Sequence, residues 1–425
     1  MVTSAPHNDA APASGPPGLA LYVHIPFCET KCPYCDFNTY AGIEALMPAY
    51  VDALAHEIAG WGKVLGAPPL RSVFFGGGTP SYLPTRDLTR LMHAVRSAFD
   101  LPDEAEVTVE ANPGDTVRER LQSMRRAGFN RISIGVQSLD DNELRLLGRR
   151  HDADQAMQAV AAAREAGFAN VSLDLIFGLP RQLVSSWEHT LREAVALAPD
   201  HLSAYALTLE GGTPMEVDVR LGRLADPDPD IGAEMYRLTQ ELLAGAGYAQ
   251  YEISNWARPG RESTHNLAYW RSESYLGVGP GAHSYLWANG LPALGSLGPA
   301  GIRFANLKSP RLYVERAQAW TPGNADLSAA LGTVPTVDER EALDEATAIS
   351  DVLMMGLRLN LGVADAAFAA RWGRGITEAV PEPLAECLVL GLLEWSGPAL
   401  RLTEHGRLLA NEAFERFVAA AAASR

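Results

Sequence analysis

The stretch CETKCPYC, residues 28–35, places Cys28, Cys32 and Cys35 at spacings of four and three residues, directly after the apolar run 19–25. Three thiolates so close together can bind three irons of a 4Fe-4S cluster and leave the fourth iron open for another ligand. Zinc is the alternative, but structural zinc sites use four ligands in paired short spacings, and no second Cys or Cys/His pair follows. A structural disulfide fits poorly, because three is an odd number and nothing marks the chain as secreted. The motif therefore predicts a 4Fe-4S cluster held by these cysteines.

The composition indicates a protein of more than one domain. At 425 residues the chain exceeds one ordinary domain, and 47% hydrophobic residues allow a large core. Its net charge of −16 argues against a nucleic-acid partner, which would require a basic face. No apolar run approaches the roughly 20 residues that span a bilayer, and only four cysteines occur, so we expect a cytoplasmic protein. The fourth, Cys387, lies in an apolar stretch and is expected to be a buried small side chain.

From residue 19 onward, short β-rich runs alternate with amphipathic helical stretches, which is typical of parallel strands joined by crossover helices. Strands are expected from residues 19, 71, 106, 131, 171 and 201, with helices at 44–65, 86–99, 115–127, 153–167 and 186–197. Six such units predict an α/β fold, a partial (β/α)6 barrel, although an open doubly wound sheet gives the same alternation. Residues 1–17, rich in Ala, Pro and Ser, are expected to form a disordered tail.

Polar or glycine-rich residues follow the first five of these strands. Chemistry in parallel α/β folds collects at the carboxyl ends of strands, so these residues should converge on one mouth. Free glycine amides, carboxylates and a two-pronged arginine are suited to a polar ligand. The candidates are the three cysteines, then Gly77, Gly78 and Thr79, then Glu110, then Gln137 with Arg149, and Asp174. Singly, each also fits an ordinary turn, a solvated carboxylate or a basic helix start, but their shared placement favours one site.

The sequence YVHIPFCETKCPYCDF, residues 22–37, resembles the opening of radical S-adenosylmethionine (radical SAM) proteins. The resemblance implies a partial barrel in which the amino and carboxylate groups of S-adenosylmethionine bind the open iron. More narrowly, the sequence is similar to the branch that contains oxygen-independent coproporphyrinogen III oxidase and the HemW heme chaperones. The cofactor-binding positions of that branch match Tyr22, Tyr34, Gly77, Gly78, Thr79, Glu110, Gln137, Arg149 and Asp174.

Residues 263–285 are dense in His, aromatic residues and Gly. His265 could supply an iron-ligating nitrogen, and Tyr269 with Trp270 could pack on a flat macrocycle. A buried aromatic cluster under a long loop is the alternative that the residue types alone favour. However, HNLAYW, residues 265–270, resembles the HNxxYW motif of the HemW family, to which heme binding is attributed. The resemblance therefore implies a heme site at His265, Tyr269 and Trp270.

The chain is expected to divide into a radical SAM core over 18–250, the HNLAYW segment with a loop-rich connector over 251–335, and a C-terminal domain over 336–425. Helical patterns at 338–360, 364–373 and 377–393 lead into the ribbon LLEWSGPALRLTEHG and a last helix. This order resembles a helical, winged-helix-like tail. Acidic residues outnumber arginines there, so phosphate binding is not expected.

The resemblance implies a heme chaperone that binds heme and passes it to an acceptor protein, built on a radical SAM core with a 4Fe-4S cluster and S-adenosylmethionine. The alternatives are coproporphyrinogen III oxidase and a radical SAM enzyme with another substrate. The oxidase pattern has a further Cys where this sequence has Phe37, and a longer ordered N-terminal segment, so oxidase activity is not expected. The heme acceptor and the oligomeric state stay open, and a homodimer is compatible with the sequence.

Overall fold

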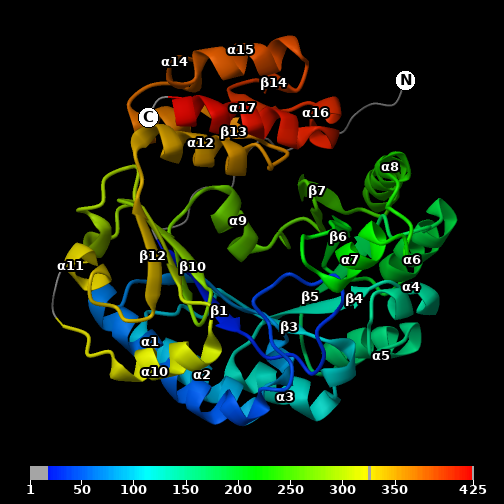
Figure 1. Ribbon diagram of the computed structural model, residues 1–425, viewed down its shortest axis with the longest axis horizontal. Helices are drawn as coiled ribbons and strands as arrows, with labels where there is room; N and C mark the ends of the chain where they lie inside the picture. The colour runs from blue at the N-terminus through cyan, green and yellow to red at the C-terminus, as the bar shows by residue number, and fades with distance from the viewer. Residues whose placement is uncertain (1–17, 324–326, 424–425) are drawn as a thin grey trace.

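Six parallel strands, β1 to β6, lie side by side in chain order and form a curved sheet (Figure 1). The computed structural model describes residues 18–323 and 327–423, so the tail expected over 1–17 lies outside the described residues. The strands are β1 Leu19–Ile25, β2 Leu70–Gly77, β3 Glu106–Ala111, β4 Arg131–Gln137, β5 Asn170–Phe177 and β6 His201–Ala206. Their unbroken sequential order confirms the partial (β/α) barrel and excludes the doubly wound sheet, whose strand order reverses.

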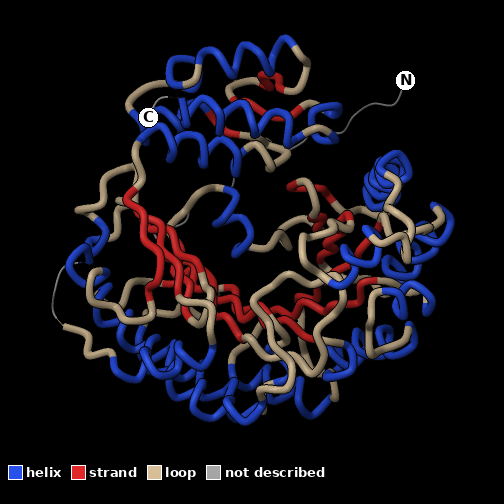
Figure 2. Tube along the Cα trace, viewed as in Figure 1, coloured by secondary structure: helices blue, strands red, loops and turns tan. Residues whose placement is uncertain are grey.

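Helices cover the outer, convex face of this sheet (Figure 2). Those between the first six strands are α1 Met47–Leu65, α2 Thr85–Ala98, α3 Arg118–Ala127, α4 Asp141–Leu146, α5 Ala153–Glu165 and α6 Val184–Ala196. Local signals set their ends: Asp152 and Gln155 form a capping box at the start of α5, and Gly66 ends α1 in the left-handed conformation. All but the short α4 were expected from the sequence.

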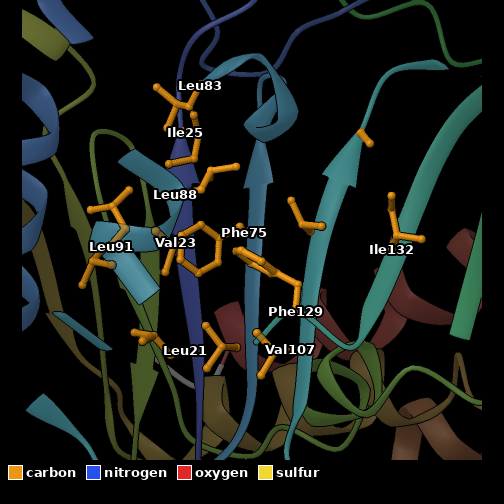
Figure 3. Packing of buried hydrophobic residues seen from close by; sticks show 14 of the residues in the cluster. Leu21, Val23, Ile25, Phe75, Leu83, Leu88, Leu91, Val107, Phe129 and Ile132 are labelled. Carbon is orange, nitrogen blue, oxygen red and sulfur yellow. The ribbon is translucent and has the colours of Figure 1, made fainter. Parts of the chain in front are cut away.

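The strands divide their side chains between an apolar outer face and a polar inner face. Leu21, Val23 and Ile25 of β1 pack with Phe75 and with α2 residues in the buried core (Figure 3). Side chains alternate along a strand, so the positions between these point to the inner face. On β3 and β4 the inner positions hold residues such as Glu110, Arg131 and Ser133. The interior of the partial barrel is therefore polar enough to hold a ligand.

The sheet continues beyond both edges of the six-strand unit. Beside β6 lie the antiparallel strands β8 Asn255–Ala257 and β7 Ala249–Glu252. Beside β1 lies β9 Tyr275–Val278, which is parallel, followed by β10 His283–Leu286, β11 Ile302–Asn306 and β12 Val337–Ala342, which are antiparallel. The connector within 251–335 was expected to be loop-rich, but it contains β11, α10 Pro310–Ala319 and α11 Leu327–Leu331. Strand β12 replaces the start of the helix expected from 338. Strand β9 pairs with β1, and β10 pairs with β9. Pairing between segments so far apart is not visible in the periodicity of the sequence.

Three helices lie between β6 and β9: α7 Pro214–Arg220, α8 Pro229–Gly245 and α9 Thr264–Trp270. Helix α9 lies on the concave side of the sheet, where it faces the barrel interior (Figure 1). Its N-terminus is capped by Ser263, whose hydroxyl accepts a hydrogen bond from the Asn266 amide. The HNLAYW segment is thus a short helix against the inner face of the barrel, not a surface connector.

The C-terminal region is mainly helical and has its own buried core, which contains Leu353, Cys387 and Phe417. Its helices are α12 Glu345–Gly356, α13 Asp365–Trp372, α14 Ile376–Ala379, α15 Pro381–Val389, α16 Glu404–Leu408 and α17 Ala410–Ala423. Three short strands pair in the order β13 Val363–Ala364, β15 Ala399–Leu402 and β14 Leu393–Ser396. Strands β14 and β15 form the expected ribbon, whereas β13 was not expected. Across the described ranges, no helix combines the length and apolar character needed to cross a bilayer.

Candidate functional site

A cavity of about 570 Å³ opens at the carboxyl ends of the barrel strands. Most of the residues that the sequence analysis selected line it together, although they come from different strand ends. They are Cys28, Cys32, Tyr34, Cys35, Gly77, Gly78, Thr79, Glu110, Gln137, Arg149 and Asp174. The parallel arrangement brings these side chains to one place, because all six strands point the same way.

The three cysteine thiols are half-buried at the mouth of this cavity. The Thr79 hydroxyl donates to Cys28 Sγ at 3.6 Å, and Arg149 Nη1 donates to Cys32 Sγ at 3.3 Å. Cys35 Sγ lies 3.9 Å from Thr39 Oγ1. Burial raises the pKa of the Cys28 and Cys35 thiols. Hydrogen-bond donors and a cation directed at the sulfurs favour thiolates, the form that ligates iron.

A 4Fe-4S cluster fits this donor set. Among residues 18–323 and 327–423, no three His, Cys, Asp or Glu side chains are arranged to hold a single metal ion. A cluster does not need ligands that converge on one ion, because each thiolate binds a different iron. Three sulfurs on a short loop beside an open cavity also leave room for the fourth iron and its ligand.

The glycines beside the cysteines permit close backbone contacts. A Cβ on Gly78 would lie 2.7 Å from the Phe27 carbonyl oxygen and 3.1 Å from Cys28 Sγ. Gly77 has φ +108°, a left-handed conformation that favours glycine, and a Cβ there would lie 2.4 Å from the His24 ring. Glycine is therefore required here by packing against the cysteine loop, in addition to any contact with a ligand.

Two carboxylic acids, Glu110 and Asp174, face the inner part of the cavity. Burial, with the nearby charge of Asp174, raises the pKa of Glu110 to about 8, although its Oε2 accepts a hydrogen bond from the Gly77 amide at 3.0 Å. Burial also raises the pKa of Asp174, whose oxygens accept from the Ser133 hydroxyl at 2.9 and 3.1 Å. Both groups can accept hydrogen bonds from the hydroxyl or amine groups of a bound cofactor.

Arg149 and Gln137 also line the cavity, and Arg149 contacts Cys32. Arg149 Nη2 donates to the Gly135 carbonyl at 3.0 Å, whereas its buried Nε has no hydrogen-bond partner. Gln137 has φ +67°, which is strained for a residue with a side chain and often marks functional sites. The unpaired donor and the strained backbone are both features that a bound ligand would explain.

Tyr22 is placed differently from the expectation that it lines the cofactor pocket. Its ring stacks on Phe74 with centroids 6.2 Å apart, and its hydroxyl lies 3.0 Å from His24 Nδ1. Phe74 lines the cavity, but Tyr22 does not belong to the cavity wall that the described residues form. Tyr22 therefore supports the wall from within the barrel.

The HNLAYW side chains also depart from the expectation of a free iron ligand and an open aromatic surface. His265 is 1% exposed, its Nδ1 is 2.9 Å from Ser72 Oγ, and its Nε2 is 2.9 Å from the Tyr269 hydroxyl. Its ring stacks on Phe74, and burial lowers its pKa to about 3. With both nitrogens engaged, His265 does not offer a ligand to heme iron in this structure.

Tyr269 and Trp270 hold α9 in place on its other sides. The Tyr269 ring packs edge-on against Tyr275, and the Arg358 guanidinium of the C-terminal region lies 4.6 Å from the Trp270 ring centroid. The motif thus joins the barrel interior to the C-terminal region. Of its residues, Asn266 lines the cavity.

Sequence reasoning did not select several other residues of the cavity wall, including Phe37, Phe74, Arg131, Ser133, Tyr205 and Asn266. For Arg131, Ser133 and Gly135 a signal existed: they alternate along β4 with the buried Ile132 and Ile134. Polar residues at every second position of a parallel strand are unusual, because such strands are normally apolar on both faces.

Comparisons with known proteins agree with this geometry. The Radical SAM superfamily profile matches residues 22–194, and the HemN C-terminal domain profile matches residues 343–409. The heme chaperone HemW of Bacillus subtilis is 37% identical over 400 residues, which cover 94% of this chain and 99% of that protein. HemW of Mycobacterium tuberculosis is 38% identical and covers 94% of this chain and 95% of its own length.

A solved structure shows the same fold over nearly the whole chain. Coproporphyrinogen III oxidase (HemN) from Escherichia coli, described as a radical SAM enzyme, superposes with a TM-score of 0.77 at 25% identity, covering 94% of this chain and 90% of that one. The barrel, the cysteine loop and the near full-length similarity at 37% identity lead to one conclusion. The chain belongs to the radical SAM superfamily and, within it, to the HemW family.

Proposed function

We propose that the protein is a heme chaperone, which binds heme and delivers it to an acceptor protein in the cytoplasm. The observation that carries this proposal is the similarity to proteins named heme chaperone HemW over 94% of the chain. That similarity includes both the barrel and the C-terminal region, so it is not limited to the cofactor-binding core.

Cys28, Cys32 and Cys35 are the proposed ligands of a 4Fe-4S cluster, and Gly77, Gly78, Thr79, Glu110, Gln137, Arg149 and Asp174 the proposed contacts of S-adenosylmethionine. Their shared cavity and the unpaired Nε of Arg149 support this assignment. When bound, the cluster and S-adenosylmethionine would supply one-electron and radical chemistry. The residues of this chain contribute the binding surface, the orientation of the cofactor and a site largely shielded by the barrel.

The HNLAYW segment is proposed to act in heme binding by positioning α9 rather than by exposing His265. The hydrogen bonds of His265 to Ser72 and Tyr269 support this role, because they fix the helix that carries Asn266 to the cavity wall. A direct bond from one nitrogen of His265 to heme iron would require the hydrogen bond at that nitrogen to break.

Coproporphyrinogen III oxidase activity is the second candidate, favoured by the structural similarity to HemN. Phe37 argues against it: this residue is 63% exposed beside the cluster loop and stands where the oxidase pattern has a further Cys. The two functions are separated by heme titration beside an anaerobic oxidase assay on cluster-reconstituted protein. Saturable heme binding without porphyrinogen turnover is expected, and turnover without heme binding would replace the chaperone proposal by the oxidase.

A further inference from the structure

Arg131 lies at the inner end of the cavity, far from the cysteines along the barrel. It is the first residue of β4, and Gln137 at the mouth is the last. Six residue steps of an extended strand separate their backbones by about 20 Å. Arg131 is nevertheless one of the residues that line the cavity, and it is 2% exposed. A guanidinium group is thus buried deep in the barrel.

The described residues leave this guanidinium poorly satisfied. Its ion pair with Glu106 is long, with 3.9 Å between Nε and Oε2, and its buried Nε has no hydrogen-bond partner. Of the five N–H donors of the guanidinium, the one on Nε is thus unpaired within the described part of the chain. A buried charge in this condition normally has a partner, because desolvation without compensation is costly.

Glu106 does not fill that role, because it is already committed to the N-terminus of α9. Its Oε1 accepts from the Ser263 hydroxyl at 3.3 Å and the His265 amide at 3.1 Å, and its Oε2 accepts from the Thr264 amide at 3.1 Å. Three donors from one helix end share this carboxylate, and its contact with Arg131 stays long. The guanidinium lines the cavity and has, among the described residues, no carboxylate within hydrogen-bond distance.

Two other acids of the cavity, Glu110 and Asp174, interact with Arg131. Burial raises the pKa of both, although the charge of Arg131 acts in the opposite direction. Burial, assisted by the charge of Arg131, lowers the pKa of His201 and of His265. The inner end of the cavity thus has a cation among groups whose charged forms burial disfavours.

We propose that Arg131 forms an inner subsite that binds a carboxylate, and that its occupant is a propionate group of the tetrapyrrole, a step that rests on the proposed heme function. Arg131 is suited to hold a carboxylate by two parallel hydrogen bonds. Asn266, which follows the three residues that bind Glu106, lies on the same cavity wall and offers a further amide. This subsite is distinct from Arg149, which contacts Cys32 at the mouth.

The test compares heme with heme dimethyl ester, in which both propionates are uncharged, by titration of the full-length, cluster-reconstituted protein. The variants are Arg131→Met, which keeps much of the length of the side chain without its charge, and Arg131→Lys, which keeps the charge without the two parallel N–H donors of the guanidinium. Arg164→Gln is the matched control, because Arg164 forms an ion pair with Asp200 outside the cavity. Urea unfolding without ligand reports the stability of each variant.

Wild type is expected to bind the diester at least about tenfold more weakly than heme, because hydrogen bonds to a charged group contribute on the order of a tenfold change or more. Arg131→Met should weaken heme binding by a similar factor and leave diester binding unchanged. The heme affinity of Arg131→Lys should lie between those of Arg131→Met and wild type, and Arg164→Gln should match wild type. Equal binding of heme and diester by wild type, or equal loss of both in Arg131→Met, would overturn the subsite while leaving heme binding intact. If wild type binds neither compound, the proposed function itself fails and the subsite with it.

Discussion

Replacement of Gly78 by alanine should disrupt the cysteine loop and with it the cluster. The added Cβ would lie 2.7 Å from the Phe27 carbonyl oxygen, 2.8 Å from the Ile25 carbonyl oxygen and 3.1 Å from Cys28 Sγ. Two of these neighbours are backbone atoms next to the motif, so they cannot rotate away as the end of a side chain could. The loop that carries Cys28 has to shift.

The magnitude follows from the bonds that this shift strains. The Gly78 amide donates to the Ile25 carbonyl and the Thr79 amide to the Phe27 carbonyl, both at 2.8 Å. Each hydrogen bond contributes about 1 kcal/mol, and inserting a methyl into a packed site costs about 1–3 kcal/mol. If both hydrogen bonds are lost, the free energy of unfolding should therefore fall by about 3–5 kcal/mol in the cluster-free protein. Displacement of Cys28 should also lower cluster occupancy.

The assay is anaerobic reconstitution followed by measurement of iron and acid-labile sulfide per chain, with urea unfolding of the cluster-free protein. Gly114→Ala is the control, because a Cβ at Gly114 meets nothing within 4 Å. Gly114→Ala should match wild type in both measurements. A Gly78→Ala protein with wild-type iron content and unchanged stability would refute the argument that this glycine is required by contact with the cysteine loop.

Three other predictions concern the site. Cys28→Ala should lose most of its iron, whereas Cys387→Ala, in the separate C-terminal core, should keep it; full iron content in Cys28→Ala would exclude this thiol as a ligand. Burial raises the pKa of Glu110 from an ordinary 4.5 to about 8, so the folded protein retains a proton that the unfolded chain releases. The free energy of unfolding of the cofactor-free protein should therefore decrease as the pH rises from about 5 to about 8. Glu110→Gln should flatten this dependence in urea unfolding at several pH values, and an unchanged slope would contradict the assignment. His265→Ala removes the contacts to Ser72, Tyr269 and Phe74. It should lower the free energy of unfolding by about 2–4 kcal/mol and leave the iron content unchanged. Unaltered stability would argue against a structural role of His265.

Much of the barrel and of its mouth could be predicted from the sequence, because local signals determine them. The run around Leu21 is apolar, and the runs around Val107 and Ile132 alternate between apolar and polar residues with the period of a strand. The intervening helices carry caps such as Asp152. Parallel strands then place every strand end at one mouth, so the cysteines, Glu110 and Asp174 could be grouped before their positions were known. For these residues, the local sequence pattern and the parallel topology are enough to predict that they share one site.

Only the tertiary structure decided which side chains are free to act. His265 has the residue type of an iron ligand, but its nitrogens bind Ser72, which lies 193 residues away, and Tyr269. Arg131 has the residue type of a surface cation, but it is buried at the inner end of the cavity while Glu106 binds α9. Strands β9 to β12 likewise depend on β1, to which β9 pairs across more than half of the chain. Burial and hydrogen-bond partners are set by contacts between distant segments, and periodicity within one segment contains no information about them.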